Sequence, residues 1–199
     1  MEYIYYLLLF ILFIILIMLF STLYLSLTNK FHCLNTNLNN NDVNYNKIID
    51  HLYIGNIVAA QDISFLKKYN INVIINCSND IPNYHTIDNK IDNKIDYYRI
   101  PIDDSLEEYD INLMSELLPQ YVNIINNAIN EKKNVLVHCY AGRQRSACLI
   151  AAYLIFKYNY TIEEAYKIIL SKRKQAFHYG KAFNFNKSLI NYQNNLIKV

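Results

Sequence analysis

One short segment of the sequence combines a potential nucleophile with potential anion-binding groups. It reads Val-Leu-Val-His-Cys-Tyr-Ala-Gly-Arg-Gln-Arg-Ser-Ala over residues 135–147. The apolar start predicts a buried strand that ends at His138, and the apolar run after Arg145 predicts a helix. A loop between a strand and a helix N-terminus directs backbone N–H groups into one concavity, where the helix dipole also favours an anion. The spacing therefore predicts an anion-binding loop with Cys139 at its base.

The side chains of this loop have complementary chemistry. A Cys in the positive field of a helix N-terminus ionises at a lowered pKa, and its thiolate is a good nucleophile. The planar guanidinium of Arg145 can bind two oxygens of one phosphate group. Ser146 can donate a hydrogen bond to the sulfur, and Gly142 lets the loop curl tightly. Together these groups predict phosphoryl transfer through a phosphocysteine intermediate.

The pattern His-Cys-x-x-Gly-x-x-Arg-Ser resembles the signature of the cysteine-dependent protein tyrosine phosphatases, and its surroundings resemble their dual specificity branch. Further similarity lies at His51–Gly55, Val73–Asn76 and Glu163–Tyr166, so that residues 48–192 are covered. The resemblance implies hydrolysis of phosphotyrosine, and of phosphoserine or phosphothreonine, in proteins. We expect no cofactor and no metal, because the chain lacks an evident His/Asp cluster that could bind a metal ion.

The resemblance also implies roles for individual residues. The family places a general acid after a strand upstream of the Cys, which selects Asp104 ahead of Asp103 and Asp110. Asp104 would protonate the leaving oxygen and then activate the hydrolytic water. His138 would orient the loop and lower the pKa of the nucleophile. We therefore predict catalytic roles for Cys139, Arg145, Asp104, Ser146 and His138, and substrate binding by Cys139, Tyr140, Ala141, Gly142, Arg143, Gln144 and Arg145.

Two features depart from the dual specificity pattern. Gln144 stands where a Ser or Gly usually precedes the signature Arg, and it can alter the hydrogen bonds of the loop or the position of water. Residues 175–183 replace a Pro-Asn pair that often supports the loop. Neither change removes a chemical group that the mechanism requires.

The other cysteines have mainly structural interpretations. Cys148 fits a small core residue of the helix that follows the loop. Cys77 ends a predicted strand and is best interpreted as a buried apolar thiol. The alternative, a disulfide between Cys77 and oxidised Cys139, stays open.

Predicted strands and helices alternate around this loop. The alternation predicts an α/β domain with a central, mainly parallel sheet flanked by helices. The low-complexity repeat at 87–96 is interpreted as a loop insertion. We predict strands at 48–57 (or a hairpin), 72–76, 97–102 and 134–138, and helices at 61–68, 111–131 (bent or restarted at Pro119), 145–158 and 161–173, the last opened by a Thr161–Glu164 capping box.

The N-terminal segment has a different composition. No charged residue occurs between Tyr3 and Leu27, which is long enough for one transmembrane helix. A cleaved signal peptide is disfavoured by Glu2, by the long apolar run and by the lack of a small-residue cleavage site. We predict an anchor at 1–29, an Asn-rich linker at 30–47 and the phosphatase domain at 48–199. The domain would face the cytosol, because a thiolate nucleophile needs a reducing compartment.

Composition excludes several function classes and leaves alternatives open. A net charge of +2 does not indicate a nucleic-acid partner, and four Cys without a C-x-x-C pair argue against a zinc site or a disulfide scaffold. We expect a monomer that acts on a phosphorylated protein and contacts the membrane through its N-terminal helix. The alternatives are a phosphoinositide or RNA 5′-triphosphate phosphatase with the same chemistry, and a phospho-binding pseudophosphatase.

Overall fold

The computed structural model describes Tyr6, Ile14 and residues 43–85, 94–105, 107–177 and 185–197. The chain divides between Asp42 and Val43, and Val43–Val199 form one compact unit. Apart from two residues, the predicted anchor at 1–29 lies outside the described part, as do the predicted linker up to residue 42 and the repeat up to residue 93. Within the described ranges, no helix combines the length and apolar character that crossing a membrane requires.

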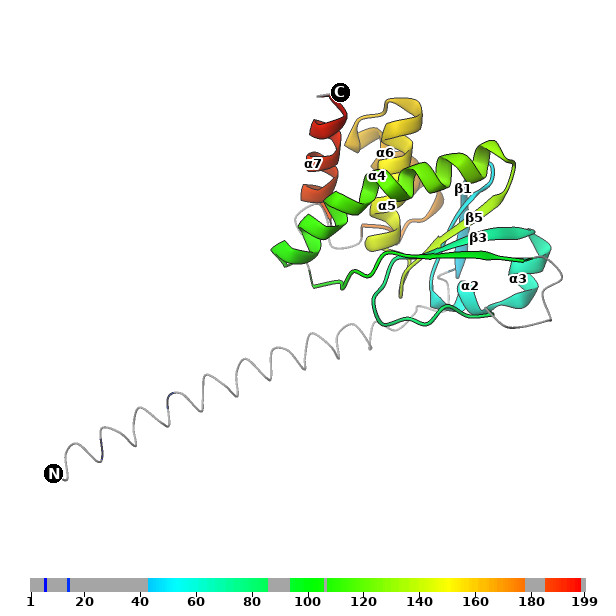
Figure 1. Ribbon diagram of the computed structural model, residues 1–199, viewed down its shortest axis with the longest axis horizontal. Coiled ribbons are helices and arrows are strands. Elements are labelled where there is room, and N and C mark those ends of the chain that lie inside the picture. Colours follow the sequence, from blue (N-terminus) through cyan, green and yellow to red (C-terminus); the bar gives the residue numbers. More distant parts are fainter. Residues whose placement is uncertain are drawn as a thin grey trace. The chain divides into compact units, whose positions relative to one another are not determined.

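A five-stranded mixed sheet forms the centre of the unit Val43–Val199 (Figure 1). Its spatial order is β1 (Tyr45–Ile49), β2 (Leu52–Gly55), β5 (Asn134–His138), β3 (Ile71–Asn76) and β4 (Asp96–Arg99). Only the β1–β2 pair is antiparallel; the other neighbours run parallel. The prediction of a mainly parallel sheet is thus confirmed, with an antiparallel hairpin added at one edge. Because β5 lies between β2 and β3, the loop that follows it emerges from the middle of the sheet.

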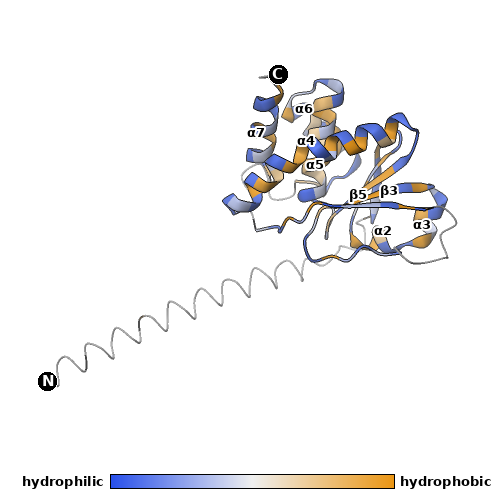
Figure 2. Ribbon diagram, viewed as in Figure 1, coloured by the Kyte–Doolittle hydropathy of each residue, from blue (hydrophilic) through white to orange (hydrophobic). Residues whose placement is uncertain are grey.

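Helices cover both faces of this sheet. Alternate residues of each strand face opposite sides, so Leu136 packs with the small cluster around Phe65 while Val135 and Val137 pack with the large one. Figure 1 shows α4 to α7 gathered on one side, and Figure 2 shows hydrophilic and hydrophobic bands on α4, as an amphipathic helix requires. The helices are α2 (Ile57–Gln61), α3 (Ile63–Lys68), α4 (Glu108–Asn130), α5 (Arg145–Tyr158), α6 (Ile162–Lys172) and α7 (Asn186–Ile197).

Two sequence predictions need correction in the first part of the domain. The chain enters β1 at Tyr45, three residues before the predicted boundary, because the ring of Tyr45 stacks on Phe65 with centroids 3.8 Å apart. The helix predicted at 61–68 corresponds to α3, and the sequence analysis missed α2, which ends at Gln61; Asp62 separates the two helices and caps α3. Its carboxylate accepts the N–H groups of Ser64 and Phe65 at 2.9 and 3.1 Å.

The later elements agree more closely with the predictions. The strand predicted at 97–102 is shorter and ends at Arg99. Helix α4 begins earlier than predicted and continues through Pro119 without a restart. The capping box of α6 is confirmed, since Thr161 and Glu164 bond each other's backbone N–H groups. The strand and helix on either side of the loop lie where the sequence predicts them.

Candidate active site

Cys139 lies where the chain leaves β5, at the start of the loop that leads into α5. This segment, residues 139–145, is the Cys139 loop. The Cys139 side chain is 1% exposed, and its Sγ lies 3.4 Å from the Oγ of Ser146. Arg145 opens α5, is also buried, and donates from Nη1 to the carbonyl of Ile102 at 3.1 Å. The hydrophobic packing of β5 and α5 therefore fixes the nucleophile beside a guanidinium and a hydroxyl.

The surroundings of Cys139 favour its thiolate. Burial by itself raises the pKa of this thiol. The positive charge of Arg145 and hydrogen bonds from the side chain and backbone of Ser146 act in the opposite direction and prevail, although Asp104 opposes them. The pKa of Cys139 is consequently lower than that of an ordinary Cys. A thiolate held between a cation and a hydroxyl donor can attack an electrophile and can later leave again.

Asp104 lies beside the same guanidinium. Its Oδ2 is 3.7 Å from Nη2 of Arg145. Burial raises the pKa of Asp104, the charge of Arg145 lowers it, and the nearby charge of Asp110 raises it; the net shift is upward. A carboxyl group with a raised pKa retains its proton at a higher pH, as a general acid must. The structure thus brings Asp104 together with Cys139, Arg145 and Ser146.

Asp110 organises the loop that carries Asp104. It lies in the first turn of α4, 7% exposed. Its Oδ1 accepts the backbone N–H of Asp103 at 3.3 Å, and its Oδ2 accepts the hydroxyl of Ser105. That hydroxyl also accepts the N–H of Glu107 at 3.0 Å. Sequence reasoning ranked Asp110 last as an acid, and in the structure its carboxylate binds the backbone and the Ser105 side chain of the loop that carries Asp104.

Comparison with known proteins assigns the chain to a family. The sequence profile of the family described as "Dual specificity phosphatase, catalytic domain" matches residues 52–195. The chain belongs to the dual specificity phosphatase family. Human dual specificity protein phosphatase 7 is 31% identical over 150 residues, which is 75% of this chain and 33% of the human protein. The chain thus spans about a third of the length of such curated relatives, and it contains the catalytic domain of a protein phosphatase.

Solved structures share the fold of this domain. Human DUSP28 aligns with a TM-score of 0.65 at 21% identity, over 77% of this chain and 95% of DUSP28. A mouse chain described as a dual specificity phosphatase, complexed with zinc tungstate, aligns with a TM-score of 0.64 at 25% identity. That alignment covers 77% of this chain and 88% of the mouse chain. The predicted family is confirmed.

His138 of this dual specificity phosphatase domain is neutral. Burial lowers its pKa to about 4; the charges of Arg99 and Arg145 add to this effect, and a hydrogen bond with the Cys139 backbone opposes it. A neutral imidazole bonded to that backbone can orient the residue. His138 is not among the groups that lower the pKa of Cys139, which are Arg145 and Ser146.

The remaining residues of the Cys139 loop lie at its rim and its rear. The carbonyl of Tyr140 accepts the N–H of Ile57 at 3.0 Å, which connects the loop to α2. Gly142 adopts φ 65°, a left-handed conformation that favours glycine. Gln144, which departs from the family pattern, is 3% exposed, and within the described structure its amide has no hydrogen-bond partner. Arg143 is half-buried.

Sequence reasoning missed Arg173, the residue that ends α6. It is 1% exposed, and its guanidinium donates to the carbonyls of Ala141 and Gly142. The only signal was a charged residue at the end of an amphipathic helix, which also fits a solvent-exposed side chain. The contact spans 31 residues and follows from tertiary packing.

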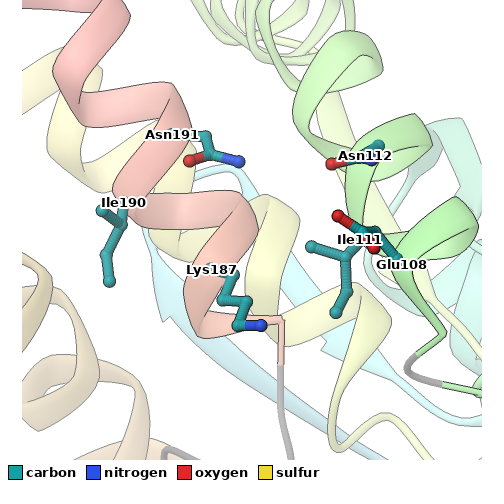
Figure 3. Close-up of a pocket in the computed structure, with 6 residues that line it drawn as sticks. All are labelled: Glu108, Ile111, Asn112, Lys187, Ile190 and Asn191. Atoms are coloured by element: carbon teal, nitrogen blue, oxygen red, sulfur yellow. The ribbon is translucent and has the colours of Figure 1, made fainter.

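A separate cavity of about 290 Å³ lies between α4 and α7 and contains none of these groups. Figure 3 shows the residues that line it, which are Glu108, Ile111 and Asn112 on α4 and Lys187, Ile190 and Asn191 on α7. Among the residues that the structure describes, no group of three or more His, Cys, Asp or Glu side chains could hold a metal ion.

Proposed function

We propose that this protein hydrolyses phosphate monoesters on proteins, at phosphotyrosine and at phosphoserine or phosphothreonine, through a phosphocysteine formed on Cys139 without a metal ion. The observation that carries the proposal is the geometry of the Cys139 thiol, whose Sγ lies 3.4 Å from the hydroxyl of Ser146 and beside the buried guanidinium of Arg145, which together lower its pKa. A carboxyl group of raised pKa lies 3.7 Å from the same Arg145. A nucleophile, an anion-binding group and an acid thus lie together, and these are the groups needed to transfer a phosphate to Cys139 and then to hydrolyse the phosphocysteine.

In the first step the thiolate attacks the phosphorus and the P–O bond to the substrate breaks. Arg145 and the N–H groups of the Cys139 loop bind the non-bridging oxygens, whose charge they stabilise in the transition state. Asp104 transfers its proton to the leaving oxygen, so that the substrate departs as a neutral alcohol or phenol. The products of this step are the dephosphorylated residue, phosphocysteine and an ionised Asp104.

In the second step Asp104 takes a proton from water as the water oxygen attacks the phosphorus. The P–S bond breaks, and its electron pair returns to the sulfur as a thiolate. The hydroxyl of Ser146, 3.4 Å from Sγ, stabilises this leaving group. Inorganic phosphate departs, and the enzyme returns to its starting protonation state.

The choice of substrate class rests on the relatives. The curated proteins similar to this chain are named dual specificity protein phosphatases. The mouse relative binds tungstate in its crystal structure, and tungstate is a tetrahedral oxyanion of phosphate-like shape. Phosphorylated protein side chains are therefore the substrates that we propose for this chain.

We also propose that residues 1–29 anchor the protein in a membrane, with the phosphatase domain on the cytosolic side. Support comes from the sequence alone: the run from Tyr3 to Leu27 is uncharged and long enough to cross a bilayer. Carbonate extraction of membranes from cells that express the chain tests the anchor, and protease protection tests its orientation. Release of the protein by carbonate would contradict this proposal.

The test of function is hydrolysis of an aryl phosphate in the presence of a chelator, with Cys139→Ser beside the wild type. We expect activity to survive chelation, to vanish in the variant, and to leave phosphate bound to Cys139 in the rapidly quenched wild type. Cys148→Ser is the matched control, because it makes the same change at a buried thiol of α5 that bonds the carbonyl of Phe185 instead. Activity that depends on metal, or that remains in Cys139→Ser, would refute the mechanism.

A panel of substrates then separates the alternatives. Phosphotyrosine and phosphothreonine peptides should be hydrolysed in preference to phosphoinositides and RNA 5′-triphosphates. Faster hydrolysis of either competitor would replace the proposed substrate class. Tight binding of tungstate without turnover would identify a phospho-binding protein.

A further inference from the structure

Three consecutive carbonyls of the Cys139 loop accept hydrogen bonds from one side. Nη2 of Arg173 donates to the carbonyl of Ala141 at 3.0 Å, and its Nε donates to the carbonyl of Gly142 at 2.6 Å. The backbone N–H of Phe177 donates to the carbonyl of Arg143 at 2.9 Å. The end of α6 and the turn after it therefore bind the rear of the loop.

The direction of these carbonyls determines the direction of the N–H groups that follow them. No described peptide bond is cis, and in a trans peptide the C=O and the next N–H point in opposite directions. With the carbonyls of 141, 142 and 143 turned toward Arg173 and Phe177, the N–H groups of Gly142, Arg143 and Gln144 point away from them. Aligned N–H groups of this kind form an anion-binding concavity.

Arg173 is itself held by the first strand. Its Nη1 donates to Oδ1 of Asn46 at 2.8 Å and to the carbonyl of Val43 at 3.2 Å. These contacts span more than a hundred residues of sequence. One buried guanidinium thus connects the beginning of β1 to the Cys139 loop.

The packing around Gly142 matches this connection. A side chain at Gly142 would run into the carbonyl oxygen of Gly55 and into the guanidinium of Arg173. The positive φ of Gly142 and the absent Cβ allow Arg173 to approach the backbone closely enough to bond two carbonyls. The loop sequence and Arg173 are therefore fitted to each other.

We propose that Arg173 is a positioning residue that holds the Cys139 loop in its oxyanion-binding conformation, and that Asn46 holds Arg173 in place. The proposal rests on the phosphatase function given above and adds a residue that touches neither substrate nor nucleophile. A guanidinium suits this role because its planar fork donates in several fixed directions, whereas the ammonium of a Lys is a point charge. Arg173→Lys should therefore keep the charge and lose the alignment.

The experiment measures tungstate affinity of the full chain for the wild type, Arg173→Lys and Asn46→Ala, together with KM and kcat for an aryl phosphate. We expect Arg173→Lys to weaken tungstate binding about 10- to 100-fold, the factor that hydrogen bonds of a charged donor provide. Asn46→Ala should weaken it about 3- to 10-fold, because only one of the supports of Arg173 is removed. KM should rise more than kcat falls.

Two neighbouring substitutions serve as controls. Lys172→Met removes a positive charge from an exposed position next to Arg173, and Lys47→Ala alters an exposed residue of β1 that pairs with Asp50 at 2.7 Å. Both should keep wild-type tungstate affinity. The rate at which Cys139 is alkylated, measured as a function of pH, gives the pKa of its thiol independently. This pKa should rise in Arg173→Lys and stay unchanged in both controls.

The outcomes separate this proposal from the function on which it rests. Tungstate binding that weakens in Arg173→Lys and Asn46→Ala supports the positioning role even if the wild type turns over no substrate. Unchanged tungstate affinity and thiol pKa in a folded Arg173→Lys overturn the positioning role even if the wild type is an active phosphatase. If Arg173→Lys fails to fold, Asn46→Ala decides: weakened binding supports the proposal, and wild-type affinity overturns it.

Discussion

Acidification should destabilise the folded domain through His138. Burial, with the positive charges of Arg99 and Arg145, lowers the pKa of this imidazole from 6.5 to about 4. In the unfolded chain these influences are absent, so the pKa returns to its ordinary value. Between the two values the unfolded state binds a proton that the folded state does not. The free energy of unfolding therefore has its full value above pH 6.5 and falls as the pH drops toward 4.

Proton linkage sets the magnitude of this loss. A shift from 6.5 to about 4 removes about 2 kcal/mol of stability by about pH 5 and about 3 kcal/mol by about pH 4. Urea unfolding of the wild type and of His138→Gln across this range measures it. Gln supplies an amide of similar size that does not titrate, so the difference in unfolding free energy between the two proteins should change by these amounts.

Comparison with the variant removes the contribution of other groups. A hydrogen bond with Lys47 lowers the pKa of Asp50, and bonds with Thr161 lower that of Glu164. Both carboxylates lose stabilising contacts on acidification, but to the same extent in wild type and variant. Parallel curves for the two proteins from neutral pH to about pH 4 would refute the assignment of a neutral, buried His138.

Three further predictions concern the site directly. Asp104→Asn should lower kcat for a substrate with a poor leaving group by about 100- to 10,000-fold, because the general acid is lost. The rate of the wild type should decline at high pH as Asp104 loses its proton above its raised pKa, and this decline should be absent in the variant. A decline that persists in the variant would belong to another group. Gly142→Ala should lower the free energy of unfolding by about 1–3 kcal/mol, because φ is 65° at this residue and a Cβ would meet Gly55. Urea unfolding measures this change, and an unchanged free energy would contradict the described loop. Iodoacetamide at about pH 6.5 should label Cys139 before Cys77 and Cys148, whose pKa values burial raises, and peptide mapping that finds equal labelling would contradict this order.

The centre of the site could be predicted because its information is local. A continuous apolar run predicts β5, a second one predicts α5, and the loop between them contains the nucleophile and its anion binder within seven residues. Asp104 was selected through the family resemblance, and packing places it beside Arg145. The role of each residue in catalysis stays a prediction until the variants are measured.

The supports of the site could not be predicted, because their contacts join distant segments. Arg173 meets β1 across 127 residues, and no local pattern distinguishes a buried Arg from an exposed one at a helix end. The start of β1 was missed for a similar reason: Tyr45 lies in a polar, Asn-rich stretch, and it joins the core through tertiary contacts of its ring with Phe65 and Tyr69. The break between α2 and α3 depends on the capping carboxylate of Asp62, which the apolar pattern does not reveal.

In the proposed mechanism, the ion pair between Arg145 and Asp104 connects substrate binding to proton supply. The guanidinium lies 3.7 Å from the carboxylate and lowers its pKa, against the effect of burial. A phosphate dianion that binds the fork of Arg145 neutralises that charge and adds negative charge of its own, and both changes raise the pKa of Asp104. Asp104 is therefore protonated most fully when a substrate is present to receive the proton. After the leaving group departs with that proton, the carboxylate is ready to deprotonate water, and release of phosphate restores the original pair. The contact with Arg145, which lowers the pKa of Asp104, thus couples the protonation of Asp104 to the presence of substrate.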